Sequence, residues 1–218
     1  MCTGLKGDIL EIGSGMGTFS EKIISRSSPH SRITLTDVSL SYVKKLEEWF
    51  LNMAYNDSCK NIKVCKLDLN CEEDYDLIGY RKFDSIIAIN VLEHVENDEF
   101  ALQQLYDMLR KGGRLFLLVP CHKFLYNVID QEVGHFRRYV KSELEHKAKN
   151  NQFTIERMFY FNMLGIIGWY INGNLARRPK IDGTASKIFD RLVPISKYIE
   201  KTTHQRMGLS IICYLSKN

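Results

Sequence analysis

The stretch "GDILEIGSGMGTF" at residues 7–19 decides how the rest of the chain is interpreted. It begins as an apolar run and ends in three alternate glycines, Gly13, Gly15 and Gly17, before a segment with helical periodicity. Glycine lets a backbone turn sharply and lets a ligand approach without a Cβ in the way. We therefore predict a buried strand, a turn that holds a nucleotide, and a helix, in that order.

Strand and helix patterns alternate along the rest of the chain. Apolar or β-branched runs predict strands, and the segments with apolar residues at helical spacing predict helices. This alternation predicts an α/β fold, a doubly wound, Rossmann-like sheet of seven strands that is mostly parallel. The strands are expected at 7–13, 32–37, 61–68, 82–90, 113–120, 153–162 and 208–218, and the helices at 17–27, 39–54, 98–113 and 141–151.

Residues 162–206 interrupt the alternation between the sixth and seventh strands. Helical segments at 163–180 and 186–201 predict a helical insertion between these two strands. We expect residues 1–218 to form one domain, because the chain is long enough to bury a substantial core and no linker divides it. Only about six residues precede the first strand, so we expect either a naturally minimal protein or a missing N-terminal segment.

The composition is that of a globular protein, with 44% hydrophobic and 26% charged residues. The six cysteines are scattered, without a C-x-x-C pair or zinc-ligand spacing, so we expect free thiols in a reducing cytoplasm and no metal. Net charge is −7 over residues 1–109 and +11 over residues 110–218. The basic half favours an anionic partner, such as a phosphorylated substrate, a membrane surface or nucleic acid, unless it is only a solvated surface.

The spacing of the glycines distinguishes between nucleotide ligands. A dinucleotide fingerprint, G-x-G-x-x-G, would place its third glycine at position 18, which is Thr18. Gly17 lies one position early, and the phosphate-loop pattern G-x-x-x-x-G-K-[ST] is absent. The spacing therefore argues against a nicotinamide dinucleotide.

Polar residues follow the second, third and fourth strands, where ligands of doubly wound sheets bind. Asp37 lies twenty positions after Gly17, and a carboxylate there can accept two hydrogen bonds from a ribose diol. Asp68 ends the third strand, and "NVLEHV" at residues 90–95 follows the fourth. Capping of helices or turns is the alternative role for both aspartates.

Together, E-x-G-x-G-x-G at residues 11–17, the two aspartates and "NVLEHV" resemble the class I S-adenosylmethionine-dependent methyltransferases over nearly the whole chain. A seventh strand at the C-terminus also suits that fold, in which it runs antiparallel between strands five and six. The resemblance implies S-adenosylmethionine as cofactor and S-adenosylhomocysteine as product.

The resemblance also implies a role for each matching residue. The glycine loop, ordered by its glutamate, would lie beside the methionine part of the cofactor. The residues after strands two and three would bind ribose and adenine, and those after strand four would line the sulfonium end. The implied cofactor-binding residues are Glu11, Gly13, Ser14, Gly15, Gly17, Asp37, Val38, Asp68, Leu69, Asn90, Val91 and His94.

Candidates for the acceptor side lie after the fifth strand, in "VPCHKFLYNVIDQEVGHFRRYVKSEL" at residues 119–144. Long loops at strand ends commonly carry specificity. One histidine would act as a base oriented by the aspartate, and the arginines would clamp a carboxylate or phosphate. A packed loop without catalytic function is the alternative. The candidates are His122, His135, Asp130, Arg137 and Arg138.

This segment and "YFNMLGIIGWYINGN" at residues 160–174 resemble a subgroup of small bacterial methyltransferases associated with glycan or lipid-linked sugar metabolism. The apolar stretch and the basic residues behind it suit a lipid-bearing acceptor, or peripheral membrane contact through residues 159–180. The alternative is an insertion that packs on the sheet and walls the acceptor pocket.

We therefore expect O-methylation of a small-molecule or glycan- or lipid-linked acceptor. A nucleic-acid methyltransferase is the alternative that the basic half supports, although "NVLE" differs from the N/D-P-P-Y/F pattern of enzymes that methylate base amino groups. A nicotinamide-dependent oxidoreductase and a non-catalytic cofactor-binding protein remain further alternatives.

Overall fold

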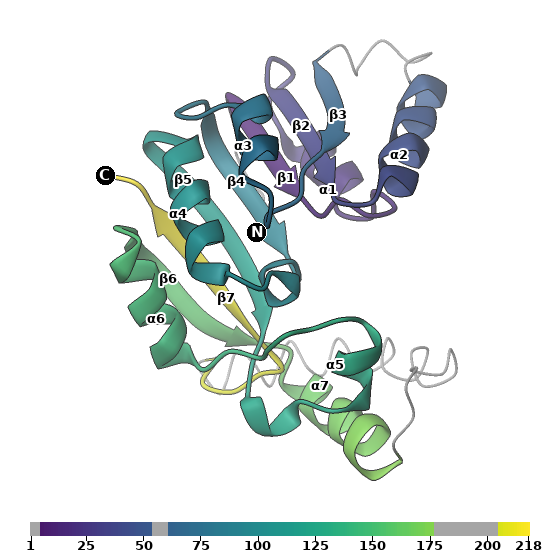
Figure 1. Cartoon of the computed structure of the whole chain (residues 1–218), viewed down its shortest axis with the longest axis vertical. Coiled ribbons are helices and arrows are strands. Elements are labelled where there is room, and N and C mark those ends of the chain that lie inside the picture. Colours follow the sequence, from purple (N-terminus) through teal and green to yellow (C-terminus); the bar gives the residue numbers. More distant parts are fainter. Residues whose placement is uncertain (1–4, 54–60, 177–204) are drawn as a thin grey trace.

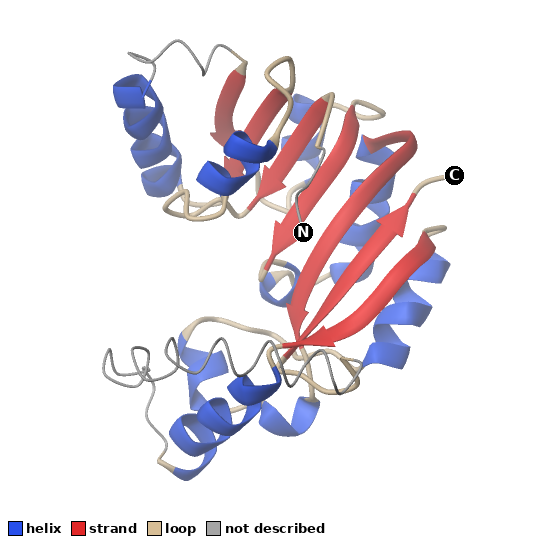
Figure 2. Cartoon of the chain, turned by 180° about the vertical axis from the view of Figure 1, so that it is seen from behind, coloured by secondary structure: helices blue, strands red, loops and turns tan. Residues whose placement is uncertain are grey.

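The computed structural model describes residues 5–53, 61–176 and 205–218, which form a seven-stranded sheet with helices on both faces (Figures 1 and 2). The strands lie in the order β3-β2-β1-β4-β5-β7-β6. They are β1 (Asp8–Ile12), β2 (Arg32–Asp37), β3 (Ile62–Lys66), β4 (Phe83–Ile89), β5 (Leu109–Pro120), β6 (Thr154–Phe161) and β7 (Ser210–Ser216).

The pairing of the strands confirms the predicted fold class. Strands β1 to β5 are parallel, and β7 runs antiparallel between β5 and β6. Strand β1 pairs with β2 on one side and with β4 on the other, so the winding of the chain reverses there. In such sheets ligands bind outside the carboxyl ends of the strands at this reversal.

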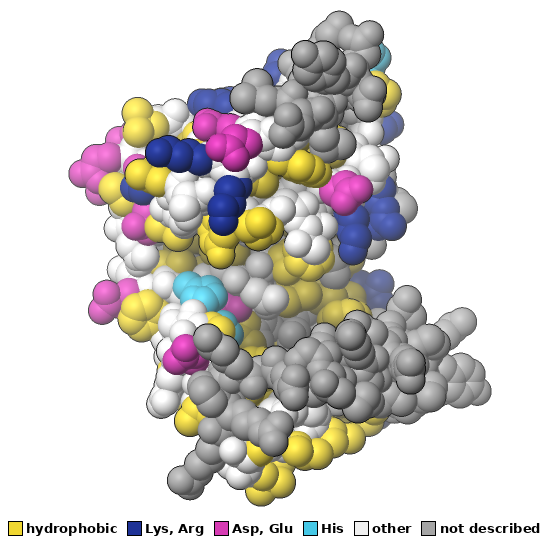
Figure 3. Space-filling view, turned by 90° about the vertical axis from the view of Figure 1, so that its right-hand side faces the viewer, with side chains coloured by type: hydrophobic (Ala, Val, Ile, Leu, Met, Phe, Trp, Pro, Cys, Tyr) yellow, Lys and Arg dark blue, Asp and Glu magenta, His cyan; other side chains and the backbone are white. Residues whose placement is uncertain are grey.

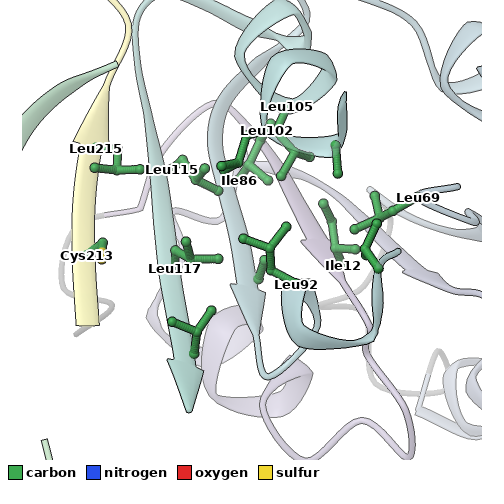
Figure 4. Close-up of a cluster of buried hydrophobic side chains, with 14 of the residues drawn as sticks. Ile12, Leu69, Ile86, Leu92, Leu102, Leu105, Leu115, Leu117, Cys213 and Leu215 are labelled. Carbon is green, nitrogen blue, oxygen red and sulfur yellow. The ribbon is translucent and has the colours of Figure 1, made fainter. Parts of the chain in front are cut away.

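Alternate side chains of the central strands explain why helices cover both faces, because the side chains of a strand point alternately to opposite faces. Leu10 of β1 and Ile86 of β4 face a cluster that includes side chains of α3, α4 and α6. Figure 4 shows Ile86 of this cluster beside Leu102 and Leu105 of α4. Ile9 and Ile87, the neighbours of Leu10 and Ile86, face a second cluster with residues of α1 and α2. All four are buried, and each contributes about 1.5–3 kcal/mol of hydrophobic stabilisation.

Four helices lie where the sequence predicts them, with shifts of a few residues at their ends. They are α1 (Ser20–Arg26), α2 (Leu40–Met53), α4 (Asp98–Met108) and α6 (Lys141–Asn150). The short elements α3 (Glu72–Ile78), α5 (Val128–Glu132), η1 (Leu92–His94) and η2 (Lys123–Leu125) were not predicted. Each is shorter than the window of about 11 residues in which helical periodicity becomes visible.

The predicted boundary between the fourth helix and the fifth strand is wrong. Helix α4 ends at Met108, and β5 begins at Leu109 instead of residue 113. Leu109 pairs with Phe83 of β4, and a change of register follows before the regular pairing of Arg114 with Ser85. The glycines at 112 and 113 thus lie within an irregular part of the strand, because sheet pairing outweighs their usual role of ending a helix.

The predicted insertion begins as expected with α7 (Met163–Trp169), which continues into the π-helical turn η3 (Tyr170–Leu175). Helices α5 and α7 lie beyond the carboxyl end of β5 (Figure 1). The second predicted helix, at 186–201, falls outside the described residues. Within the described ranges, no helix has the length and apolar character needed to cross a membrane.

Candidate functional site

The turn after β1 is built from glycines in the left-handed region. Gly13, Gly15 and Gly17 have φ values of 69°, 53° and 83°, which glycine adopts at little cost. A Cβ on Gly13 would lie 2.5 Å from Cγ2 of Val91, so packing as well as backbone conformation requires glycine there. A Cβ on Gly15 would meet no atom within 4 Å, so at that position only the backbone conformation requires glycine.

Glu11, in β1, stabilises this turn through hydrogen bonds. Its buried carboxyl group accepts hydrogen bonds from Ser14 Oγ at 3.1 Å and from Ser20 Oγ, at the start of α1, at 2.5 Å. Burial raises the pKa of Glu11, and the two serine hydrogen bonds oppose that shift. The structure therefore places Glu11 where it orders the glycine loop.

Asp37, at the end of β2, joins the glycine loop to the start of α2. Its Oδ2 accepts a hydrogen bond from the backbone N–H of Gly15 at 2.9 Å, and its Oδ1 accepts one from Ser39 N–H at 2.9 Å. These are the capping bonds expected as the alternative role. A carboxylate offers about four lone-pair sites, however, so Asp37 can also accept hydrogen bonds from a ligand.

The residues after β3 are held by α3. Asp68 N–H donates to Asp74 Oδ2 at 2.8 Å, and the hydroxyl of buried Tyr75 donates to the carbonyl oxygen of Leu69 at 2.9 Å. The carboxylate of Asp68 accepts hydrogen bonds from the backbone and side-chain nitrogens of Asn70 at 2.9 and 3.2 Å. This turn therefore has a defined conformation beside β2.

The segment after β4 begins with a left-handed residue, Asn90, at φ 52°, which asparagine adopts more readily than most residues. Its backbone N–H donates to the carbonyl oxygen of Leu118 in β5. Further on, Nδ1 of His94 lies 3.2 Å from the carbonyl oxygen of Gly134. Burial, and then the nearby His135, lower the pKa of His94, so its ring is neutral at pH 7 and Nδ1–H donates to that carbonyl.

These strand ends enclose one cavity of about 400 Å³. In the space-filling view, histidine side chains lie beside a hollow in the middle of one face (Figure 3). Of the residues predicted to bind the cofactor, eight line the cavity: Gly13, Asp37, Val38, Asp68, Leu69, Asn90, Val91 and His94. Glu11, Ser14, Gly15 and Gly17 do not, and the lining residues that sequence reasoning missed are Ile12, Tyr42, Leu67, Asn70 and Val95.

On the acceptor side, the structure brings together Asp130 and His135. Nδ1 of His135 lies 2.7 Å from Asp130 Oδ1, as expected for a histidine oriented by a carboxylate. Asp130 is fully buried and also accepts hydrogen bonds from Arg138 Nε at 2.9 Å to each oxygen. Burial opposes ionisation of Asp130, but the hydrogen bonds from His135 and Arg138 together hold its pKa below the usual value.

The structure does not bring the other acceptor-side candidates to this pair. The ring of His122 stacks on Tyr160, with ring centroids 5.5 Å apart. Arg137 forms an ion pair with Asp98 at 2.9 Å, and the guanidinium of Arg138 is buried against Asp130. Both arginines thus have partners within the protein, and their clamp on an anionic acceptor stays a prediction.

Glu93 is a residue of this region that sequence reasoning missed. Its side chain is fully buried, and neither carboxyl oxygen has a hydrogen-bond partner among the described residues. Burial raises the pKa of Glu93 to about 8. Its Oε1 lies 3.8 Å from Nε2 of His135. Its position in "NVLEHV" was visible in the sequence, but nothing there showed that this carboxylate would face a histidine 42 residues away.

Comparison with known proteins identifies similar sequences and folds. A family model described as a methyltransferase domain matches residues 10–115. Malonyl-[acyl-carrier protein] O-methyltransferase 1 of Ilyobacter polytropus is 27% identical over 154 residues, which cover 68% of this chain and 53% of that protein. The chain spans about half the length, or less, of the curated relatives it matches.

Solved methyltransferase structures share the fold. An S-adenosylmethionine-dependent methyltransferase from Mesorhizobium loti superposes with a TM-score of 0.64 at 12% identity, covering 99% of this chain and 92% of that one. Phosphoethanolamine N-methyltransferase 2 of Haemonchus contortus, in complex with S-adenosylmethionine, gives a TM-score of 0.62 at 16% identity and covers 100% and 49%. Residues 10–115 therefore match a methyltransferase domain, and the chain has the fold of solved S-adenosylmethionine-dependent methyltransferases.

Proposed function

We propose that the protein transfers the methyl group of S-adenosylmethionine to a hydroxyl oxygen of a small-molecule or of a glycan- or lipid-linked acceptor. The observation that carries the proposal is the cavity lined by residues from the ends of β1, β2 and β4 and from the turn after β3. In the reaction the acceptor oxygen forms a bond to the methyl carbon while the carbon–sulfur bond breaks. The sulfur keeps the electron pair, and S-adenosylhomocysteine leaves.

Each part of the cofactor has a proposed set of partners in the cavity. Asp68 and the backbone N–H of Leu69 bind adenine, with Val38 beside the ring. Asp37 accepts hydrogen bonds from the ribose hydroxyls. The methionine part lies along Gly13, Ser14 and Gly15, and the sulfonium faces Asn90, Val91 and His94. Holding donor and acceptor in line in this way can lower the barrier by about 7–11 kcal/mol.

The choice of oxygen as the attacked atom rests on the acceptor side. A hydroxyl must lose its proton to become an effective nucleophile, and a positioned group can speed that step by about 10²–10⁴-fold. His135 is held through Nδ1 by Asp130, which leaves Nε2 as an electron-pair donor beside His94 at the cavity. We infer that the acceptor hydroxyl gives up its proton at the cluster that contains His135.

A lipid-linked acceptor and peripheral membrane contact remain proposals for the region around α7. Apolar side chains there are exposed, with Ile167 at 59%, Ile171 at 49% and Leu175 at 67%. Co-sedimentation with anionic vesicles that falls when Ile167 and Leu175 are replaced by serine would support such contact. Four free thiols among the described cysteines accord with the proposed cytoplasmic location.

Cofactor choice is the first test of this proposal. In calorimetric titrations, we expect the protein to bind S-adenosylmethionine and S-adenosylhomocysteine in the micromolar range and NAD at least about 100-fold more weakly. Transfer of labelled methyl groups to a panel of phenols, sugars and polyprenyl-linked sugars then identifies the acceptor. Binding of NAD in preference to S-adenosylmethionine would reject the proposal in favour of an oxidoreductase.

Replacement of Asp37 by asparagine tests the assignment of the ribose site. The two carboxylate oxygens of Asp37 each accept a backbone N–H, and an amide can replace only one of them. We expect Asp37→Asn to weaken S-adenosylmethionine binding by about 10- to 100-fold, measured by calorimetry, because a charge-assisted hydrogen bond contributes about 1.5–3 kcal/mol. Glu47→Gln on exposed α2 is the control, and equal affinity of both variants would contradict the assignment.

A further inference from the structure

We propose that Glu93, His94 and His135 bind a divalent transition-metal cation, and that Zn²⁺ fits their donor atoms best. One donor atom from each residue lies within 4.8 Å of the other two. The scattered cysteines led us to expect no metal, and no local spacing indicates this site, because about 40 residues separate Glu93 and His94 from His135. Two imidazoles and one carboxylate form a set that holds zinc in enzymes while leaving a coordination position open.

The two histidines already have the outer partners that metal-binding histidines usually have. Such a histidine donates its second ring N–H to a carboxylate or a backbone carbonyl, which fixes the ring and directs the other nitrogen to the metal. Nδ1 of His135 is bonded to Asp130, and Nδ1 of His94 lies at hydrogen-bond distance from the carbonyl of Gly134. In both rings Nε2 is therefore the nitrogen with a free electron pair.

Glu93 supplies an independent reason to expect a ligand. Its fully buried carboxyl group has two oxygens without a hydrogen-bond partner among the described residues, one of which lies 3.8 Å from His135 Nε2. Leaving a buried acceptor unpaired costs about 1–3 kcal/mol, and more for a charged group. A cation between the carboxylate and the two imidazoles removes that cost, since it satisfies the carboxylate and both nitrogens together.

The donor atoms must move closer together, by up to about 1.5 Å from the 4.8 Å within which they lie. Zinc bonds to nitrogen and oxygen are about 2.0–2.2 Å long, so donor atoms at a tetrahedral zinc lie about 3.3 Å apart. Nε2 of His135 and Oε1 of Glu93 would therefore approach each other by about 0.5 Å from their separation of 3.8 Å. The backbone joins the two segments in this arrangement, because Phe136 N–H donates to the carbonyl oxygen of Glu93 at 2.8 Å.

The position of the metal site indicates a role for the cation in the proposed reaction. His94 lines the cofactor cavity, so the fourth coordination position is available to a water molecule or to an acceptor oxygen. A hydroxyl bound to zinc loses its proton at a much lower pH than a free one, and the proton passes to solvent. This last step rests on the proposed methyl transfer, whereas the metal site itself does not.

Direct metal binding tests the site without an acceptor. The full-length protein is stripped with EDTA, dialysed, and titrated with Zn²⁺ by calorimetry and with Co²⁺ by visible absorption. We expect one equivalent of Zn²⁺ to bind and Co²⁺ to give the intense visible bands of a four-coordinate site. Glu93→Gln and His135→Gln should each weaken Zn²⁺ binding by at least about 100-fold, whereas His146→Gln, which removes an exposed histidine of α6, should not change it.

The outcomes separate the two proposals. Absence of stoichiometric Zn²⁺ binding by the wild-type protein, or unchanged binding by His135→Gln, overturns the metal site. Circular dichroism and a thermal melt identify a variant that fails to fold, and His94→Gln then replaces it in the comparison. Titration of the same samples with S-adenosylmethionine tests the proposed function separately, because its cavity is lined by residues of four strand ends and only His94 is shared.

Discussion

Replacement of Gly13 by alanine is expected to weaken S-adenosylmethionine binding by about 30- to 150-fold. A non-glycine residue at φ 69° costs about 1–2 kcal/mol. The added Cβ would also lie 2.5 Å from Cγ2 of Val91, which must move, and Val91 lines the cavity. A combined loss of about 2–3 kcal/mol in binding corresponds to that change in the dissociation constant. Calorimetric titration of the purified variant measures it.

Two further variants separate backbone strain from the steric clash. Gly112→Ala also places alanine at a positive φ, 78°, where its Cβ would meet no atom within 4 Å and where no residue of the cavity lies. It should lose stability but not cofactor affinity. Combining Gly13→Ala with Val91→Ala removes the clashing methyl group, so the double variant should bind better than additivity predicts. Binding by Gly13→Ala within about threefold of wild type would contradict the assignment of this turn to the cofactor.

The order and type of the strands could be predicted from the sequence because their signals are local. The period-two pattern of β1 and β4, which divides their side chains between two faces, is contained within each strand. The start of β5 could not be predicted in the same way. Leu109 belongs to the sheet because Phe83, far away in the sequence, pairs with it, and the sequence near Gly112 and Gly113 favours the end of a helix.

The cofactor side and the acceptor side of the site also differ in whether local sequence signals determine them. The predicted cofactor residues lie near the ends of strands, and parallel strands bring their carboxyl ends to one edge, so eight of these residues share the cavity. The proposed acceptor side is formed by tertiary contacts between η1 and the segment around α5. Adjacent arginines in "RRY" therefore have different partners, Asp98 for Arg137 and Asp130 for Arg138, and no local pattern distinguishes them.

Replacement of Asp130 by asparagine is expected to lower the free energy of unfolding by about 3–5 kcal/mol. Arg138 and Asp130 are both almost fully buried, with side chains 1% and 0% exposed, and removing one partner of a buried pair leaves the other charge uncompensated. Asp130 also accepts hydrogen bonds from His135 and from the backbone N–H of Asn127. An amide has one acceptor oxygen, so it cannot serve all three donor groups.

Urea denaturation in EDTA measures this loss, which corresponds to a fall in Tm of roughly 6–20 °C for a chain of this size. The control is Glu156→Gln, which breaks an exposed ion pair with Arg114 and should cost less than about 1 kcal/mol. In Asp130→Asn combined with Arg138→Met, the buried charge is removed while an aliphatic side chain still packs against Trp169. That double variant should be more stable than the sum of the two single losses predicts. If Asp130→Asn alone lowers the free energy of unfolding by less than about 1 kcal/mol, another group must compensate the charge of Arg138. The segment around α5 would then not depend on Asp130 for its stability.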